Sequence, residues 1–370
     1  MMKDNKMSWM FYLFLANGLL FSESRFLKKD KYLNGPQKEW SQRQFAKYYR
    51  HIDKHSRKTA DSDEQILRRQ DAIISGNKIT TQIWNYGSIS EPGNRVTDII
   101  WEGLGYGYEF GPFISAEVPL QNNNHPDAYP KVINGDTTWH ARVISDGLVT
   151  DPERSPDGSE YWTWEPLAYS DEGLFFADPD YDKIPTASDI DRDFDGKPDS
   201  WASDWYNPNL KEYVWPGDLR QGASNADEEA FFVCDDRNNK EFEYYPFPDD
   251  SSRKGLGIQI EYRYYQWANP LAEDIIFLIY KITNKSPKDL ENVIFGMWGD
   301  PHIGGPSDWS DDLSYFDQEI NMVYCWDEDG SASGSANRPG YFGYKFLESP
   351  GNPYDQLDND SDGMIDESRS

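Results

Sequence analysis

Hydrophobic and polar residues alternate along several short stretches between residues 76 and 350. The first stretch, Lys78–Trp84, has a period of two and is followed by the turn-forming segment Asn85–Ser88. Loops rich in Gly, Pro, Asp and Asn separate the stretches, and none repeats with a helical period for more than about two turns. Further strand-like stretches are Phe113–Val118, Thr137–Ser145, Leu256–Tyr265, Asp274–Thr283, Asn292–Trp298 and Asn321–Trp326. This pattern predicts a mostly β protein, a β-sandwich or barrel with long irregular acidic loops.

Two neighbouring stretches predict different places in a sheet. Asp274–Thr283 is apolar on both faces, which is typical of a central strand. The polar segment Asn284–Asp289 and the stretch Leu290–Trp298 follow it, so the three together predict a hairpin. Leu256–Tyr265 alternates instead, with Ile and Tyr on one face and Gln, Glu and Arg on the other. This alternation predicts a half-exposed strand.

The first 24 residues have the order of a secretory signal peptide. Lys3 and Lys6 form a positive head, Met7–Phe21 is an apolar run, and the small residues Ser22 and Ser24 suit a cleavage after Ser24. The run is short for a membrane span, although an N-terminal membrane anchor is the alternative. The order therefore predicts export to the medium or the cell surface, with no membrane span in the mature chain.

Charge and the pattern of hydrophobic and polar residues divide the rest of the chain into segments. Residues 25–75 are basic and polar and predict a leader that is helical or partly disordered. Residues 76–221 predict a β-rich, loop-heavy domain, and residues 222–350 predict a β-sandwich domain. Residues 351–370 predict a C-terminal acidic loop or linker.

Composition excludes two classes of protein. The chain has 36 Lys+Arg and 65 Asp+Glu, a formal net charge of −29, so nucleic-acid phosphates would be repelled. It also has 15% aromatic residues, which a wholly disordered acidic chain lacks. Aromatic residues are crowded at Tyr161–Trp164 and between residues 201 and 215, where they could either stack on sugar rings or pack within the protein. The two cysteines, Cys234 and Cys325, lie in strand-like runs and could form a disulfide or remain buried thiols.

Two loops share the pattern D-x-D-x-D-G-x-x-D. In both, alternate carboxylates supply hard oxygen ligands, a glycine allows the sharp turn, and a backbone carbonyl and a further carboxylate can close the shell. Clustered acids repel one another without a cation, which favours a metal site over a plain acidic turn. The predicted metal ligands are Asp191, Asp193, Asp195, Lys197 and Asp199 in the first loop, and Asp358, Asp360, Asp362, Met364, Asp366 and Glu367 in the second.

These loops resemble the calcium-binding repeats of thrombospondin type 3 and dockerin modules, and the first half of an EF-hand loop. The resemblance implies Ca²⁺ as the bound ion. Both loops lack the bidentate Glu of an EF-hand at position 12, where Ala202 and Arg369 stand. The closing ligand must therefore come from elsewhere, with Glu367 as a candidate in the second loop.

A third acidic loop follows Trp298. It contains Asp300, Asp311, Asp312 and Asp317, which could hold a cation or could simply form an acidic surface loop. The loop lies between two predicted strands, so we expect it at one end of the sandwich.

Three further runs carry a wider resemblance: Tyr245–Asp250, Gly296–Pro301 and Gly340–Tyr344. They are similar to runs in long exported proteins of Gram-negative bacteria, which often end in a type IX secretion sorting domain. The 370 residues contain no such domain, which predicts either a fragment or a different export route. The resemblance implies no particular reaction.

The sequence carries few signs of an enzyme. It contains neither H-E-x-x-H nor G-x-S-x-G, and no catalytic carboxylate pair can be located among its many acids. We therefore expect a secreted or surface-exposed, calcium-binding structural, adhesive or binding module. Its expected partners are polysaccharide or cell-surface components. Two alternatives remain open: a polysaccharide-acting hydrolase or carbohydrate-binding protein, and a calcium-dependent filament or surface-layer subunit that self-assembles.

Overall fold

A computed structural model describes residues 8–17 (backbone), 69–90, 96, 98–147, 155, 162–166, 184–332, 335 and 337–348. The rest of the predicted signal peptide, the leader up to residue 68 and the acidic loop at residues 358–367 lie outside these ranges. Helix is limited in the described residues to the 3₁₀ turn Ser203–Trp205. None of their helices has the length and apolar character needed to cross a membrane.

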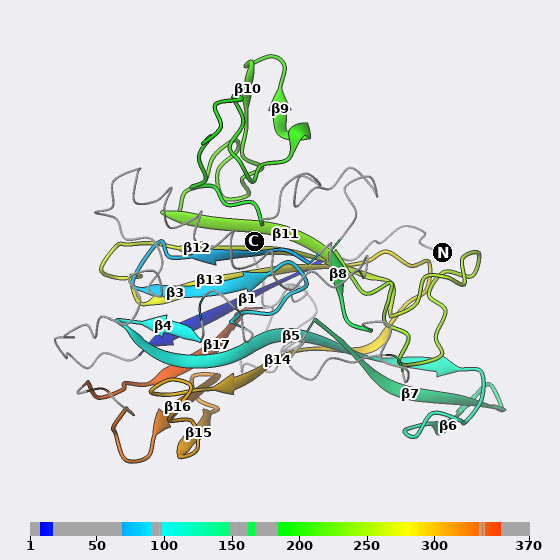
Figure 1. Cartoon of the computed structure of the whole chain (residues 1–370). Coiled ribbons are helices and arrows are strands. Elements are labelled where there is room, and N and C mark those ends of the chain that lie inside the picture. Colours follow the sequence, from blue (N-terminus) through cyan, green and yellow to red (C-terminus); the bar gives the residue numbers. More distant parts are fainter. Residues whose placement is uncertain are drawn as a thin grey trace.

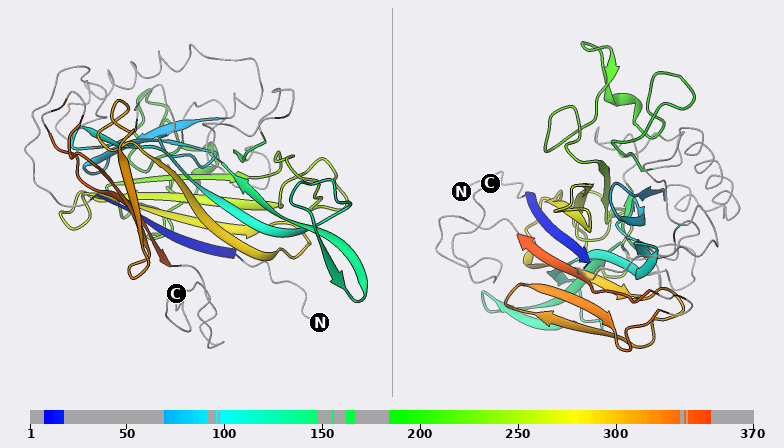
Figure 2. Two further views of the ribbon diagram at one scale, coloured as in Figure 1. Left: turned by 90° about the horizontal axis from the view of Figure 1, so that it is seen from below. Right: turned by 90° about the vertical axis from the view of Figure 1, so that its left-hand side faces the viewer.

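The described residues form two large antiparallel sheets and a short hairpin (Figure 1). The first sheet has the strand order β15 (Asp312–Asp317), β16 (Met322–Asp327), β17 (Phe342–Glu348), β1 (Ser8–Asn17), β13 (Ile275–Asn284), β12 (Ile258–Gln266), β11 (Glu228–Asp235), β8 (Glu165–Pro166). The second has the order β2 (Asp71–Ile74), β3 (Ile79–Trp84), β4 (Ile99–Trp101), β5 (Leu104–Leu120), β7 (Asp136–Asp146), β6 (Tyr129–Ile133), and β14 (Glu291–Pro301) also pairs with β5. The hairpin consists of β9 (Tyr206–Asn207) and β10 (Glu212–Tyr213) and projects beyond the sheets (Figures 1 and 2).

Aromatic contacts join the two sheets. The Phe110 ring of β5 lies 4.9 Å from the Phe342 ring and 5.7 Å from the Tyr344 ring, both of the β17 segment. On β13, the Tyr280 ring lies 5.6 Å from the Phe295 ring of β14. Buried residues of both sheets form one hydrophobic core. The prediction of a mostly β, sandwich-like fold is confirmed.

The sequence predicted the faces of β12 but not its degree of burial. Ile258, Ile260 and Tyr262 are buried as expected, but on the other face Gln259 is also buried and only Glu261 and Arg263 are partly exposed. In β13, which lies between β1 and β12, the apolar residues of one face are fully buried.

The predicted hairpin between β13 and β14 is wrong. Both edges of β13 are already hydrogen-bonded, one to β1 and the other to β12, so β14 pairs with β5 in the other sheet. The connection is held by Asn284, whose Nδ2 donates to the Lys288 carbonyl at 2.8 Å, and by Lys285, whose backbone N–H donates to the Gly257 carbonyl at 2.9 Å. β14 pairs with β5, and β11 pairs with β8, so each pair joins a strand before residue 221 to one after it. The predicted domain boundary at residue 221 therefore does not separate the two sheets.

Strand β5 is longer than predicted because glycines interrupt its hydrophobic pattern. Two glycines, Gly107 of β5 and Gly299 of β14, lie against the Phe110 ring, and a Cβ on either would overlap that ring. Another, Gly103, has φ 86° and follows Glu102 with φ 46° in the two-residue turn between β4 and β5. Positive φ at both central residues is typical of a type I′ hairpin turn.

The two cysteines are buried free thiols. Cys234 lies in β11 and Cys325 in β16, which stand five strand positions apart in the same sheet. At about 4.8 Å per strand this separation is roughly 24 Å, whereas a disulfide needs Cα atoms within about 7 Å. The possible disulfide is therefore not formed.

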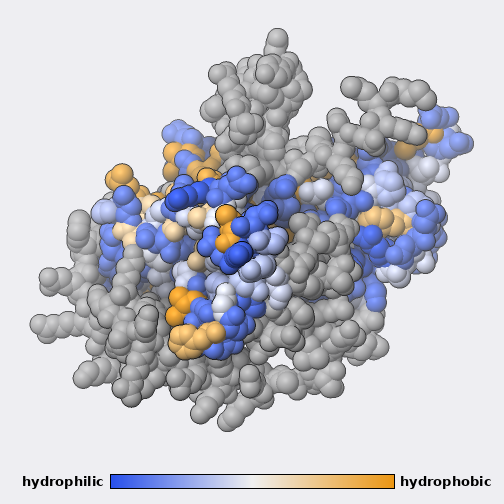
Figure 3. Space-filling view, turned by 90° about the horizontal axis from the view of Figure 1, so that it is seen from above, coloured by the Kyte–Doolittle hydropathy of each residue, from blue (hydrophilic) through white to orange (hydrophobic). Residues whose placement is uncertain are grey.

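The described residues on one face of the molecule are mainly hydrophilic. Seen from the side of the β9–β10 hairpin, apolar side chains form small, separate groups (Figure 3). This surface agrees with the strongly acidic composition of the chain.

The buried residue Asp236 connects three strands. It follows β11, and its carboxylate accepts the backbone N–H groups of Gly257 at 3.1 Å and Ile258 at 3.0 Å, at the start of β12. Its Oδ2 also accepts the Ser145 hydroxyl of β7 at 3.2 Å, which ties the two sheets together. Burial raises the pKa of Asp236 to about 7; the backbone N–H donors oppose the rise, and the charge of Asp235 adds to it.

We predict that Asp236→Asn lowers the free energy of unfolding by about 1–3 kcal/mol, because an amide cannot serve all the buried donors. The raised pKa means that folded Asp236 binds a proton more tightly than unfolded Asp236. Its contribution to stability therefore falls as pH rises from about 4 to about 7, and D236N should remove this fall. Urea unfolding across this pH range measures both effects. The exposed Asp249→Asn is the control, and equal behaviour of the two variants would contradict the prediction.

Candidate metal centres

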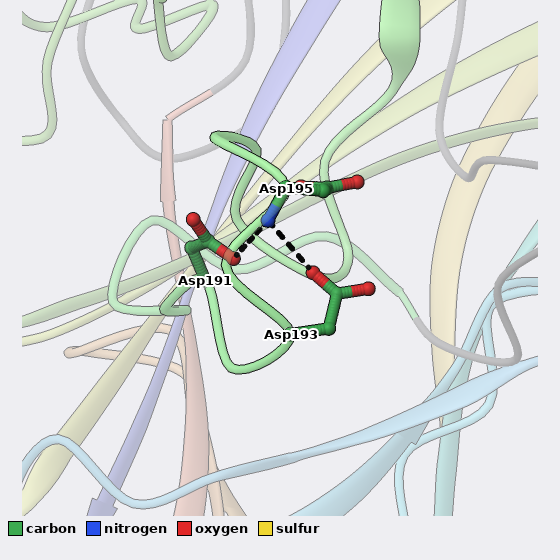
Figure 4. A group of neighbouring side chains, drawn as sticks. All are labelled: Asp191, Asp193 and Asp195. Atoms are coloured by element: carbon green, nitrogen blue, oxygen red, sulfur yellow. Dashed lines mark hydrogen bonds between the residues drawn. The ribbon is translucent and has the colours of Figure 1, made fainter.

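The first predicted loop brings three of its acids together. Ligand oxygens of Asp191, Asp193 and Asp195 all lie within 4.8 Å of one another. Phe194 has φ 66° and Gly196 has φ 95°, so the chain turns sharply within this cluster. Figure 4 shows the Asp191 and Asp193 carboxylates directed at the backbone N–H of Asp195. This is the arrangement that the alternating aspartates and the glycine predicted.

Backbone N–H groups donate hydrogen bonds to some of the carboxylate oxygens of this cluster. The Asp191 carboxylate accepts the N–H of Phe194 at 2.7 Å and that of Gly196 at 2.9 Å. The Asp195 carboxylate accepts the Lys197 N–H at 2.8 Å. The carboxylates thus have partners without a cation, while their exposed oxygens remain close enough to share one.

The fourth predicted carboxylate is engaged elsewhere. Asp199 is buried, and its Oδ2 lies 2.6 Å from Nη1 of Arg192. The same Arg192 nitrogen lies 2.6 Å from Oδ1 of Asp189. The Lys197 side chain donates to the Trp201 carbonyl at 2.9 Å, so it acts as a local brace. Of the predicted carboxylates, the structure therefore brings together the first three and pairs Asp199 with an arginine.

A second acidic cluster forms at the end of β16. Ligand oxygens of Asp308, Asp311 and Asp327 lie within 4.8 Å of one another. The first two come from the loop between β14 and β15, and Asp327 is the last residue of β16. Gly304 and Gly305, with φ 94° and 105°, turn the loop back toward this strand.

The second cluster contains a buried oxygen without a partner. Asp327 is only 6% exposed, and its Oδ1 accepts the Ser331 N–H at 3.0 Å while its Oδ2 has no hydrogen bond. The neighbouring Asp312 likewise has a buried Oδ1 without a hydrogen bond, although its Oδ2 accepts the Ile303 N–H at 2.9 Å. Buried carboxylate oxygens of this kind are costly unless a cation or donor meets them, so these residues suit a metal ion.

In and beside the second cluster, the pKa values of two acids are raised, as expected for carboxylates held close together. Burial raises the pKa of Asp327; N–H donors, including that of Ser331, oppose the rise, and the charge of Asp311 adds to it. Burial raises the pKa of Asp312 to about 6, again with a contribution from the Asp327 charge. A divalent cation bound here would favour the charged carboxylates and so lower the pKa values of both Asp312 and Asp327.

Of the four acids predicted in the third loop, the structure brings one into the cluster and places one beside it. Asp311 joins the cluster and Asp312 lies beside it, in register with Asp327 across the β15–β16 pair. Asp317 lies at the far end of β15, roughly 17 Å from Asp312 at about 3.4 Å per residue, and Asp300 lies on β14. Asp308 and Asp327, which belong to this cluster, were not among the residues that the sequence predicted. The signal for Asp327 is the run Asp327-Glu328-Asp329-Gly330 directly after a strand.

A buried Asp–His pair lies at the base of the same loop. Oδ1 of the fully buried Asp98 is 3.0 Å from Nδ1 of His302, and its Oδ2 has no hydrogen bond. The His302 ring is flanked by Tyr108 at 4.6 Å and Trp309 at 6.4 Å. Burial raises the pKa of Asp98, and the hydrogen bond to His302 opposes the rise. The pair joins the loop after β14 to the segment before β4.

The aromatic side chains between residues 201 and 215 mainly pack against one another within the protein. The rings of Trp201, Trp205 and Trp215 lie 5.3–6.1 Å from one another, and Trp215 is buried. Trp164 is also fully buried. Of the two explanations that the sequence left open, internal packing holds for these four tryptophans.

A different set of aromatic side chains is exposed beside the second acidic cluster. On the β15–β16 pair, Tyr315 is opposite Tyr324, and their rings are 5.7 Å apart. The Trp326 ring lies 5.7 Å from Tyr324 and 6.1 Å from Tyr341. Tyr315 and Tyr341 are 55% and 44% exposed. We call Tyr315, Tyr324, Trp326 and Tyr341 the aromatic face.

Comparison with known proteins finds no similar protein: no protein family model, curated protein or solved structure matches the chain.

We predict that Asp327→Asn stabilises the protein when divalent cations are chelated. The amide keeps the acceptor for the Ser331 N–H and removes a buried charge that Asp311 repels. We expect the melting temperature to rise by roughly 1–2 °C, which corresponds to about 1 kcal/mol in a chain of 370 residues.

The matched control is Asp329→Asn, two residues away. Asp329 also accepts the Ser331 N–H, at 2.8 Å, but hydrogen bonding by Ser331 lowers its pKa, so its charged form is favoured. D329N should therefore raise the melting temperature less than D327N, because it removes a charge that repels Asp327 but also loses the favoured charged form of Asp329. A lower melting temperature for D327N than for the parent protein in chelator would contradict the account of a strained acidic cluster.

Proposed function

We propose that the protein is a secreted or cell-surface module whose loops are stabilised by calcium ions bound between clustered aspartates. The observation that carries this proposal is the cluster of Asp327 with Asp308 and Asp311, in which Asp327 has a buried Oδ2 without a hydrogen bond. The cluster formed by Asp191, Asp193 and Asp195 supports it as a second site. Both clusters offer oxygen ligands only, which hard divalent cations prefer.

The loops favour calcium over magnesium. Calcium accepts six to eight oxygen ligands in irregular geometry, whereas magnesium needs a nearly ideal octahedron and usually keeps several waters. The first cluster supplies three carboxylates from one turn, and the second supplies two from a loop and one from the end of β16, with further oxygens available from backbone carbonyls and water. The signal-like segment before Ser24 adds support, because extracellular calcium concentrations suit weak sites of this type.

We predict that calcium raises the melting temperature and that a chelator reverses the rise. For dissociation constants on the order of 10⁻⁴–10⁻³ M, about 10 mM calcium stabilises each loaded site by about 1.4–2.7 kcal/mol. Asp193→Asn and Asp311→Asn should each remove part of the calcium-dependent shift, because they change different clusters. Differential scanning calorimetry with calcium, magnesium and chelator measures the shifts.

The exposed Asp127→Asn is the control, because Asp127 is an acidic surface residue outside both clusters. It should keep the full calcium response. An identical melting temperature in calcium and in chelator would exclude structural calcium sites. Equal stabilisation by magnesium would exclude the preference for calcium.

Carbohydrate binding is a second candidate function, and the aromatic face favours it. Three of its rings lie on the β15–β16 pair and Tyr341 directly precedes β17; Tyr315 and Tyr341 are exposed, and Tyr324 and Trp326 are partly buried between them. Trp326 and Asp327 are consecutive residues of β16 and project to opposite faces of the sheet, so a ligand stacked on the rings would bind separately from the second cluster.

We predict that the parent protein binds neutral polysaccharide and that Trp326→Ala weakens this binding at least tenfold. The reason is the loss of stacking surface at the centre of the face. Isothermal titration with soluble glycans measures the affinity, and release of reducing ends separates a binding module from a hydrolase. The control is Tyr206→Ala, an exposed tyrosine of the β9–β10 hairpin. Equal affinity of both variants would exclude the aromatic face as the site.

A further inference from the structure

The Asp98–His302 pair lies close to the second acidic cluster but is not one of its members. Asp98 is fully buried, and because Nδ1 of His302 is bonded to it, Nε2 is the ring nitrogen left to act as a base or as a metal ligand. The residue after His302 joins the pair to the cluster. The Ile303 N–H donates to Oδ2 of Asp312 at 2.9 Å, and Asp312 lies opposite Asp327 across the β15–β16 pair. The pair and the cluster therefore share one loop.

Two aromatic rings cover the His302 imidazole. The Tyr108 ring of β5 lies 4.6 Å from it, and the Trp309 ring of the loop lies 6.4 Å from it with 24° between the ring planes. The His302 side chain is 12% exposed, whereas Trp309 is 58% exposed. Trp309 is thus the outer layer of this stack, and the position of its loop determines how much of His302 solvent can reach.

The loop that carries Trp309 has a fixed base and an exposed tip. At the base, the His302 N–H donates to the Tyr106 carbonyl at 3.0 Å, and the Gly304 N–H donates to a second β5 carbonyl at 2.9 Å. These bonds fasten the base to β5. Residues 306–311, which we call the tip, are mostly exposed. An opening movement of the loop would therefore displace the tip, with Trp309, and leave His302 in place.

The carboxylates of the second cluster lie on both sides of such a movement. Asp308 and Asp311 flank Trp309 in the tip, whereas Asp327 is held at the end of β16. Asp327 is 6% exposed and has a buried Oδ2 without a hydrogen bond; burial, and in part the charge of Asp311, raises its pKa. Without a cation, repulsion between these charges favours a tip that moves away from β16. With a cation among them, attraction draws the tip onto the strand.

We infer that a calcium ion at the second cluster acts as a clasp: it holds the tip against β16 and Trp309 over His302, and its loss opens the Asp98–His302 pair to solvent and solutes. The inference rests on the proposed calcium binding and adds a regulatory role to that site. An ion that binds the closed loop and not the open one shifts the equilibrium toward the closed loop. For dissociation constants on the order of 10⁻⁴–10⁻³ M, about 10 mM calcium favours the closed loop by a further factor of about 10–100.

The test measures the rate at which diethyl pyrocarbonate, a reagent for imidazole, modifies His302 in the full chain. The rate is compared in calcium and in chelator, and mass spectrometry of the digested protein reports each histidine separately. We expect modification of His302 to be at least about fivefold slower in about 10 mM calcium, because the closed loop covers the ring. The partly exposed His125, in the connection between β5 and β6, is the internal reference and should react equally in both conditions.

Two variants separate the clasp from the cover. Asp311→Asn removes one carboxylate of the clasp, so the rate at His302 should be the same in calcium and in chelator. Trp309→Ala removes the cover, so the rate in calcium should rise toward that of the parent protein in chelator. The matched control is Asp193→Asn, which changes the first cluster and should keep the full calcium response at His302.

Each contrary result identifies what has failed. If calcium raises the melting temperature but leaves the rate at His302 unchanged, the clasp is overturned while the calcium sites stand. Calcium protection of His302 that persists in D311N, or a W309A variant as protected as the parent protein, overturns it as well. If calcium leaves the melting temperature unchanged, the proposed function fails, and the clasp fails with it. Calorimetry and modification on the same samples thus distinguish the two failures.

Discussion

The pairing of β14 with β5 is the interaction on which the rest of the described structure depends. It moves the chain from one sheet to the other directly after β13, and the Phe110 ring fits only because residues 107 and 299 are glycines. That ring then contacts β17 of the opposite sheet. With β14 held in this position, the loop after it can fold back against the end of β16, where the second acidic cluster forms.

The two acidic clusters differ in how they balance charge. The first lies in a turn where backbone N–H groups donate to its carboxylates, and Arg192 pairs with the flanking acids Asp189 and Asp199. The second is more deeply buried and leaves oxygens of Asp312 and Asp327 without donors. A chain with a net charge of −29 is repelled internally wherever its acids gather. The need for a cation is therefore greatest at the cluster that contains residues distant in sequence.

The sequence predicted features that depend on near neighbours. Period-two alternation located most long strands, and Asp191, Asp193 and Asp195 converge because one tight turn holds all three. Features that depend on distant pairing were not predictable in the same way. Asp327 meets Asp311 only through the register of β15 with β16, and β14 pairs with β5 only because both edges of β13 are taken. Alternation specifies a strand's faces but not its neighbours.

Arg192 has a consequence for how the first loop would respond to an ion. Its guanidinium holds Asp189 and Asp199 together across the loop, so the turn is ordered before any cation arrives. Loading would then require little loss of chain entropy and would cause little movement. The first loop is thus suited to being a rigid brace rather than a sensor, since an ion that meets a preformed turn transmits almost no displacement to the strands around it.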